Sequence, residues 1–235
     1  MASKAYNKAM CGRYTLITTK DLAGRYNLQS VPKDLRPNYN VAPGQELPVI
    51  VGESGTNQIK LMRWGLIPVW AKDQNMGYRL INARAETLLE KNTWKRPFMS
   101  QRCLVPASGF YEWRRSHKDG KPTKIPYYLH LKTDKIFSFA GLYDEWQSPE
   151  GETVQSYSII TTKPNSLVEP IHDRMPVILP PQNEADWLRH GDDDDMGFLE
   201  DLLKPYSAQV MGAYVVSSVV NNPHNNSPEV LVEPK

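Results

Sequence analysis

The sequence predicts an α+β fold that is predominantly β, built as a single domain of many short strands with a few peripheral helices. Apolar and polar residues alternate in stretches such as SYSIITT (156–162) and PYYLHLK (126–132), with the period of a half-buried strand. The 19 prolines fall mostly between such stretches, as expected for turns that connect short strands. No internal repeat and no low-complexity linker divides the chain, which favours one domain.

The alternation places the expected strands at about 47–52, 58–64, 102–106, 109–114, 126–132, 135–142, 155–161, 175–179, 210–217 and 229–233. Helices are expected at about 20–28, 83–91, 182–190 and 196–204. The second of these helices is placed by Asn82, a favourable N-cap residue, with apolar residues behind it. Trp64 and Cys103 each lie in an expected strand and are predicted to be core residues.

The composition excludes several classes of protein. Of the 235 residues 40% are hydrophobic and 23% charged, and no apolar run reaches the ~18 residues of a membrane span. The first ten residues, MASKAYNKAM, lack the apolar core of a secretory signal, and the two cysteines cannot form a disulfide framework. A cytoplasmic location is therefore expected. The net charge of +2 does not indicate a nucleic-acid partner, and the acidic run 192–195 is expected to be a solvated loop.

Four short segments place chemically versatile side chains in otherwise structural surroundings: CGRY (11–14), INARAET (81–87), GFYEW (109–113) and IHDRMPV (171–177). Singly, each has a structural explanation: a small buried side chain (Cys11), a helix cap (Asn82), a solvent-facing strand residue (Glu112) or a structural histidine (His172). Together they supply a nucleophile, a proton donor, a base and an amide that can hold a polar substrate atom. The five histidines are scattered, so neither a metal site nor a cofactor is expected.

The ordered set MCGRY, YNVAPG, RWGLIPVW, INARAET, PASGFYEW and IHDRMPV resembles the SRAP family, the SOS response-associated peptidase-like proteins. The resemblance runs from Met10 to the C-terminus, where VVNNPHNNSPEVLVEP is similar to the family's closing segment. Six motifs in order are highly specific, whereas Met-Cys-Gly alone would be weak. The resemblance implies a sensor and shield of abasic sites in single-stranded DNA that cross-links to them through an N-terminal cysteine.

The chemistry of such a cross-link explains the choice of residue. The α-amine of an N-terminal cysteine condenses with the aldehyde of an opened abasic sugar to an imine, and the neighbouring thiol closes a thiazolidine ring. An α-amine has a pKa of about 7.7–8.0, so a useful fraction is neutral near pH 7, whereas lysine at about 10.4 would need a large downward shift. The resemblance also implies autoproteolytic exposure of Cys11 and abasic-site lyase activity.

The resemblance implies a role for each matching residue. Asn82 is expected to position the opened sugar, Glu112 to transfer protons, and His172 to assist the imine chemistry. The residues expected to contact DNA are Arg13, Asn40, Pro43, Trp70, Arg84, Trp113 and Arg174. Among these, the arginines would hold phosphates, with a surface ion pair as the alternative for each, and Trp70 and Pro43 would stack on or wedge against bases.

Two other classes of function remain open from the sequence. An N-terminal-nucleophile amidohydrolase would also begin Met-Cys-Gly, but would attack a glutamine amide and pass ammonia to a second domain, for which the chain has no room. A noncovalent single-stranded-DNA-binding module would use the aromatic and arginine residues without a covalent step. The SRAP resemblance is favoured over both classes, and it implies single-stranded DNA with abasic sites as the partner, with a nucleoid association if the source is prokaryotic.

One departure from the family concerns the start of the chain. Family members begin at Met-Cys, whereas ten residues precede Cys11 here, so residues 1–10 are expected to be an extension to a domain of residues 11–235. An amide nitrogen is not a nucleophile, and the chain as written therefore cannot form a thiazolidine. We expect the active species to begin at Cys11. The extension has no evident core-forming face and is expected to be dispensable for folding.

Overall fold

The computed structural model of this chain describes residues 11–234, apart from 54, 119 and 190–195. The N-terminal extension and the acidic run of residues 192–195 both lie outside the described residues. The strands of the described part are β1 (Tyr14–Leu16), β2 (Asn38–Val41), β3 (Glu46–Glu53), β4 (Thr56–Trp64), β5 (Asn82–Arg84), β6 (Arg102–Ala107), β7 (Gly109–Lys118), β8 (Lys121–Leu131), β9 (Phe137–Gln147), β10 (Thr153–Thr162), β11 (Met175–Pro176), β12 (Ile178–Leu179) and β13 (Met211–Val215). The α-helices there are α1 (Leu22–Tyr26), α2 (Asn92–Ser100), α3 (Glu184–Leu188) and α4 (Met196–Asp201).

The larger sheet closes on itself. Its strands run in the order β11-β10-β4-β3-β6-β9-β12, and β10 also pairs with β9. The strands β10, β4, β3, β6 and β9 therefore form a closed ring, which leaves no free edge between them. β5 pairs in parallel with β10 outside the ring and is the strand that carries INARAET to the site.

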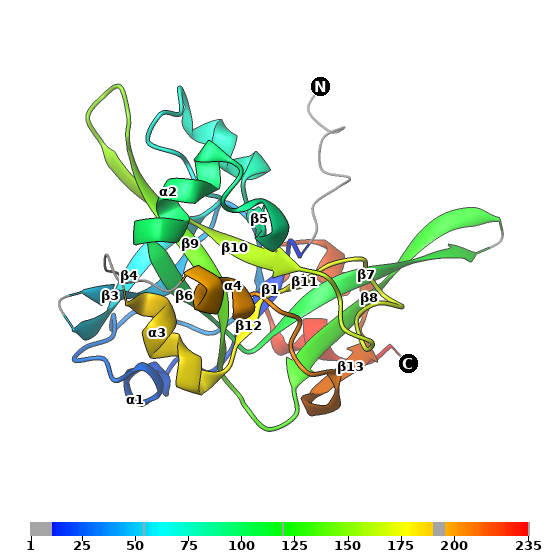
Figure 1. The fold of residues 1–235 in the computed structure, drawn as a ribbon. Helices are drawn as coiled ribbons and strands as arrows, with labels where there is room; N and C mark the ends of the chain where they lie inside the picture. The colour runs from blue at the N-terminus through cyan, green and yellow to red at the C-terminus, as the bar shows by residue number, and fades with distance from the viewer. Residues whose placement is uncertain (1–10, 54, 119, 190–195, 235) are drawn as a thin grey trace.

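A second sheet of order β13-β8-β7-β1-β2 packs against this barrel (Figure 1). The main core lies between them, where Tyr14, Phe110 and Leu129 of the second sheet contact barrel residues such as Trp64 and Phe139. The interior is densely aromatic, and the rings of Tyr14 and Trp64 meet edge to face at 5.1 Å. Trp64 and Cys103 are both buried, as the sequence predicts.

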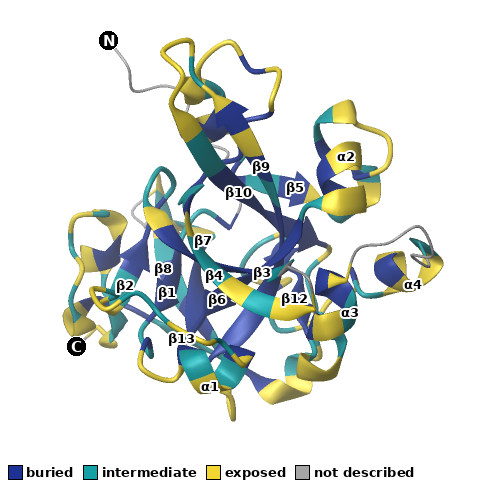
Figure 2. Ribbon diagram, turned by 90° about the vertical axis from the view of Figure 1, so that its left-hand side faces the viewer, coloured by how far each residue is buried: buried dark blue, intermediate teal, exposed yellow. Residues whose placement is uncertain are grey.

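The helices are peripheral, also as predicted (Figure 2). A second apolar cluster joins them to the barrel strands, with Leu22 of α1, Phe98 of α2 and Trp187 of α3 among its members. Alternation along the strands explains the two clusters: on β3, Val49 and Val51 belong to the main core, while Ile50 between them belongs to the helix-covered cluster. No helix in the part of the chain described here has the length and apolar character needed to cross a bilayer.

Over residues 82–100 the secondary structure differs from the sequence prediction. A helix over 83–91 is wrong: β5 and a 3₁₀ turn (Ala85–Thr87) occupy this segment, and Asn82 begins a strand instead of capping a helix. The backbone of 82–84 pairs with β10, and Ala83 is fully buried, so sheet pairing outweighs local helix propensity. The helix comes later as α2, hidden from sequence reasoning by Pro97 in its interior.

Three further differences lie near the chain ends. The expected strand 229–233 is wrong, because a 3₁₀ helix (Pro228–Leu231) stands there with proline at its start, where a fixed φ favours a helical turn. The short strands β1 and β2 were not predicted, since three or four residues are too few to show a period. The remaining expected strands and helices are all found, with 175–179 divided between β11 and β12.

Candidate functional site

Cys11 lies just before β1 and is held in an uncommon backbone conformation. Its φ is +44°, in the left-handed region that a residue with a Cβ rarely adopts, and its side chain is buried. Its backbone N–H donates a hydrogen bond of 2.8 Å to Oε1 of Glu112, 101 residues further along the chain. A strained cysteine bonded through its main-chain nitrogen to a buried carboxylate is typical of a functional site.

Glu112 faces the core side of β7 and is only 2% exposed. Burial raises the pKa of its carboxyl, an effect partly offset by nearby His172 and by hydrogen bonds from Cys11. Burial and the same carboxylate raise the pKa of the Cys11 thiol well above its usual range. The thiol therefore stays protonated at neutral pH, and Glu112 is the group that can exchange protons with Cys11. The solvent-facing alternative for Glu112 is wrong.

Asn82 and His172 complete the cluster from two other segments. The parallel register of Asn82 with Ile159 sets Asn82 beside Cys11, and its Nδ2 lies 3.5 Å from the Cys11 carbonyl oxygen. His172 follows β10 in a turn, and its Nε2 lies 3.9 Å from Oε2 of Glu112. Nδ1 of His172 accepts from the Arg174 backbone N–H at 3.2 Å and also lies 3.2 Å from Oδ1 of Asp173. The fold thus gathers all four predicted catalytic residues.

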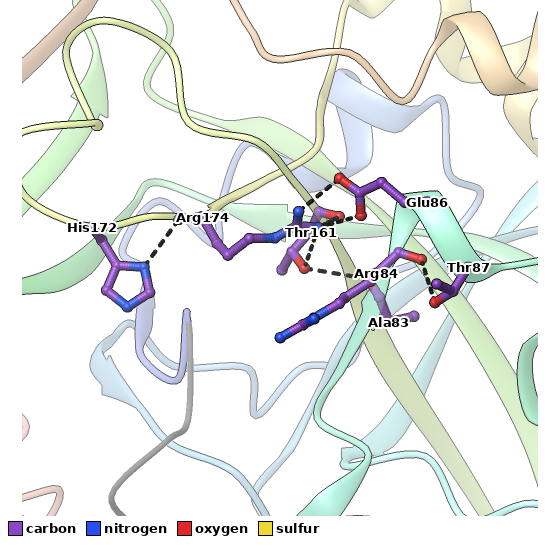
Figure 3. A network of polar contacts seen from close by, with 7 residues as sticks. All are labelled: Ala83, Arg84, Glu86, Thr87, Thr161, His172 and Arg174. Carbon is purple, nitrogen blue, oxygen red and sulfur yellow. Dashed lines mark hydrogen bonds and ion pairs between the residues drawn. The ribbon is translucent and has the colours of Figure 1, made fainter.

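The arginines beside this cluster differ in their partners (Figure 3). Arg174 makes a bidentate ion pair with Glu86, with distances of 2.7 and 2.8 Å, and also donates to the Thr161 carbonyl oxygen at 2.6 Å. The ion-pair alternative weighed for Arg174 is therefore present. Arg84 is exposed, and in Figure 3 its side chain extends away from that pair, toward the side on which His172 lies.

Arg13, Asn40 and Trp113 form a separate cluster on the other face of β7. Neighbouring residues of a strand point to opposite faces, so the Trp113 side chain lies on the face of β7 that Glu112 does not occupy. The guanidinium of Arg13 lies 5.8 Å from the ring centroid of Trp113. Asn40 accepts a 2.7 Å hydrogen bond from Arg13 and donates to the carbonyl oxygens of Val220, Asn222 and Asn225. Asn40 has no exposed surface, so direct DNA contact by its side chain is wrong for this conformation. It positions Arg13.

The segment between β4 and β5 carries the predicted stacking residue Trp70, which is 57% exposed. The backbones of Gly65 and Gly77 are in close contact and hold the two ends of this segment together. A Cβ on Gly65, where φ is +116°, would lie 2.6 Å from the Gly77 carbonyl oxygen. Trp146 donates from Nε1 to the Ala71 carbonyl oxygen at 2.8 Å and fixes the segment on the far side of Trp70. The exposed ring of Trp70 thus lies on a segment that is held by contacts on both sides. Pro43 is half-buried in the turn between β2 and β3.

Comparison with known proteins decides the family. The profile described as SOS response associated peptidase (SRAP) matches residues 10–223. The chain belongs to the SRAP family. Its fold is the SRAP fold as well: a crystal structure of a Bacteroides thetaiotaomicron protein superposes with a TM-score of 0.85 at 32% identity, covering 96% of this chain and 100% of that one.

Named SRAP relatives come from bacteria and vertebrates. The protein called abasic site processing protein YoqW of Bacillus subtilis (strain 168) is 50% identical over 225 residues, covering 94% of this chain and 99% of that protein. The one called abasic site processing protein HMCES of Xenopus tropicalis is 34% identical over 224 residues, covering 83% of this chain and 66% of that protein.

Sequence reasoning missed several supporting residues of this SRAP site. Glu86 lies inside INARAET but gave no separate signal, because its role depends on meeting Arg174 across 88 positions. Asn221 accepts a 2.7 Å hydrogen bond from Nε1 of Trp113. In the sequence this residue was recognised only as part of the closing segment VVNNPHNNSPEVLVEP, with no role of its own. Among the described residues, no group of three or more His, Cys, Asp or Glu side chains could hold a metal ion.

Proposed function

We propose that this chain senses and covalently shields abasic sites in single-stranded DNA through Cys11. The observation that carries the proposal is the 2.8 Å hydrogen bond from the Cys11 nitrogen to buried Glu112, inside a cluster that also contains Asn82 and His172. When the chain begins at Cys11, this nitrogen becomes an α-amine beside a ready proton acceptor. The names of the SRAP relatives, which refer to abasic site processing, support the same substrate.

The reaction needs no oxidant, reductant or cofactor. The lone pair of the neutral amine attacks the aldehyde carbon of the opened sugar, and loss of one water gives the imine. The thiol sulfur then adds to the imine carbon, and the thiol proton passes to nitrogen as the thiazolidine ring closes. The raised pKa of the Cys11 thiol favours this order, because the thiol stays protonated while the amine attacks first.

Glu112 would move the protons in both steps. Its Oε1 already accepts from the nitrogen that would become the amine, and its raised pKa brings its titration closer to the working pH of a general acid–base group. The Nε2 of His172 lies 3.9 Å from the other carboxylate oxygen and would assist the imine steps, including strand cleavage if the chain acts as a lyase. Asn82 would orient the sugar beside Cys11.

DNA binding around this centre would use exposed cations and one large ring. Arg84 would hold a flanking phosphate directly, since its guanidinium is exposed. Arg174, fixed by Glu86, would contribute charge from a set position, and Arg13 would do so from the opposite face of β7. Trp70 would stack on a base, with Pro43 as a wedge and Trp113 as the support of Arg13.

Removal of the residues before Cys11 is part of this proposal. While Met10 precedes Cys11, the nitrogen is an amide and cannot attack an aldehyde. Hydrolysis of the Met10–Cys11 bond would free the amine, and the strained cysteine against Glu112 supports self-processing as one route. Such an autopeptidase activity acts once per chain and does not imply proteolysis of other proteins.

The test is a denaturing gel. Chains beginning at Cys11 are mixed with a single-stranded oligonucleotide that has one abasic site, then boiled in detergent before electrophoresis. We expect a stable adduct, its absence with Cys11→Ala, and its absence with the uncleaved 235-residue chain. Noncovalent retention without an adduct would favour a plain single-strand-binding module, and a positive glutaminase assay would favour an amidohydrolase.

A further inference from the structure

Strands β7 and β8 extend beyond the sheet as a two-stranded ribbon (Figure 1). β7 pairs with β1 only at Gly109 and Phe110, and β8 pairs with β13 only from Tyr127 onward. Among the described residues, 112–118 and 121–126 therefore have no strand partner except each other. An isolated two-stranded ribbon is marginally stable in water, so a long one suggests a surface maintained for a partner.

The ribbon is rich in cations. Its sequence has five cations, Arg114, Arg115, Lys118, Lys121 and Lys124, and the only acidic residue between 113 and 127 is Asp119, which lies outside the described residues. Within the described part of the chain, no carboxylate lies within ion-pair distance of Arg114, Arg115, Lys121 or Lys124, although Arg114 stacks on Tyr127 at 5.1 Å. Arg115 lies directly opposite Lys124, a repulsive cross-strand pair unless an anion lies nearby.

One face of the ribbon continues from the functional site. Alternate residues of β7 share a face, so Phe110 in the core, Glu112 in the site and Arg114 on the ribbon lie in one row. On β8 the same face carries Tyr127 opposite Glu112 and, at the far end, exposed Lys121. We call this the inner face. Arg115 and Lys124 lie on the other, outer face.

We propose that the inner face of the β7–β8 ribbon binds the DNA strand that flanks the abasic site, through Arg114 and Lys121. A polyanion is the occupant because the cations lack acidic partners, and DNA is chosen because their row begins at Glu112. Arg114 is about 7 Å and the ribbon end about 20 Å from Glu112, at ~3.4 Å per residue. A B-form strand advances ~3.4 Å per nucleotide and an extended single strand advances further, so this length spans at most about six nucleotides. The inference rests on the proposed function for its ligand.

The test compares two variants that lose the same charge. Arg114→Gln with Lys121→Gln removes two cations of the inner row, and Arg115→Gln with Lys124→Gln removes two of the outer row; Lys118, whose register partner is Lys121, is kept in both variants. Binding of an undamaged 20-nucleotide single strand is measured by fluorescence anisotropy between about 50 and 200 mM salt. Loss of two phosphate contacts should lower the slope of log affinity against log salt by about 1.4 for the inner variant. The outer variant should keep the wild-type slope.

A second measurement separates this inference from the proposed function. Adduct formation is followed with an abasic oligonucleotide of three nucleotides, too short to reach Lys121, at saturating concentration. We expect the inner variant to match the wild type here. If both variants lose affinity equally, the ribbon is only a diffuse positive field, and if neither or only the outer variant does, the inner face is not the contact. Any of these results overturns the inference, whereas failure of the wild type to form an adduct overturns the proposed function alone.

Discussion

Replacing Glu112 with glutamine isolates the role of its charge. The amide oxygen of glutamine can still accept the 2.8 Å hydrogen bond from the Cys11 nitrogen, so the geometry of the site is retained while the proton acceptor is lost. A positioned general acid–base group contributes about 10²–10⁴-fold to a rate, and both adduct steps need proton transfer. We therefore expect adduct formation in Glu112→Gln to slow by about 10²–10⁴-fold, and reversal of the adduct to slow as well.

The pH dependence gives a second readout of the same substitution. Burial raises the pKa of Glu112 above the ordinary glutamate value of about 4.3. The ionised base is lost as pH falls through this raised pKa, so the acidic limb of the wild-type rate should lie above ~4.3. In Glu112→Gln that limb should disappear, leaving the ionisation of the α-amine. The assay is single-turnover adduct formation, quenched in detergent and quantified on a denaturing gel at each pH.

We expect Glu112→Gln to raise the stability of the fold at alkaline pH while it lowers the activity. A carboxyl whose pKa is raised on folding binds protons more tightly in the folded state, so its contribution to stability falls as pH rises through that pKa. Glu112→Gln should therefore unfold at higher urea concentration than the wild type at pH 8. Glu145→Gln, a change at an exposed carboxylate on β9, is the matched control and should alter neither property. A Glu112→Gln chain that forms adducts within about threefold of the wild-type rate at every pH would refute the assignment.

Three other substitutions test the DNA contacts and the framework. Arg84→Ala should weaken binding to undamaged single-stranded DNA and lower its salt slope by about 0.7, the value of one phosphate contact; an unchanged slope would remove Arg84 from the interface. Gly65→Ala should destabilise the fold by about 1–3 kcal/mol, since its Cβ meets the Gly77 carbonyl and its φ is +116°, and should weaken DNA binding by moving Trp70. Gly24→Ala, where a Cβ meets nothing within 4 Å, is the control and should be neutral or stabilising in urea denaturation. Arg102→Met should lower the free energy of unfolding by about 3 kcal/mol, because buried Arg102 donates to backbone carbonyls including those of Phe98, Met99 and Trp187. A loss below about 1 kcal/mol would show that water replaces the guanidinium there.

Local pattern was enough to predict the class of fold. Alternation identified the long strands because each buries one face, and that period is written in consecutive residues. Burial of Trp64 and Cys103 followed from the same pattern. The segments around Cys11, Asn82, Glu112 and His172 were also recognisable from the sequence, since their residue types carry the chemistry and their order matches the SRAP family.

Tertiary structure decided what the local pattern could not. Asn82 begins a strand because the backbone of 82–84 finds β10, a partner more than 70 residues away, and helix propensity cannot compete with that pairing. Asn40 became a support of Arg13 for a similar reason: its amide meets carbonyl oxygens some 180 residues later. Burial and long-range hydrogen bonds are properties of the assembled chain, and no window of the sequence contains them.

The same distinction runs through the site. The sequence by itself determined which groups are available: a thiol and a nitrogen at Cys11, a carboxylate at Glu112 and an imidazole at His172. Only the fold decided that the carboxylate is buried against the Cys11 nitrogen, with its pKa raised, and that Trp113 one residue later faces the other side of the sheet. The physical reason is that a pKa and a contact depend on the distance to charges and to water, which the closed barrel and its partner sheet set together.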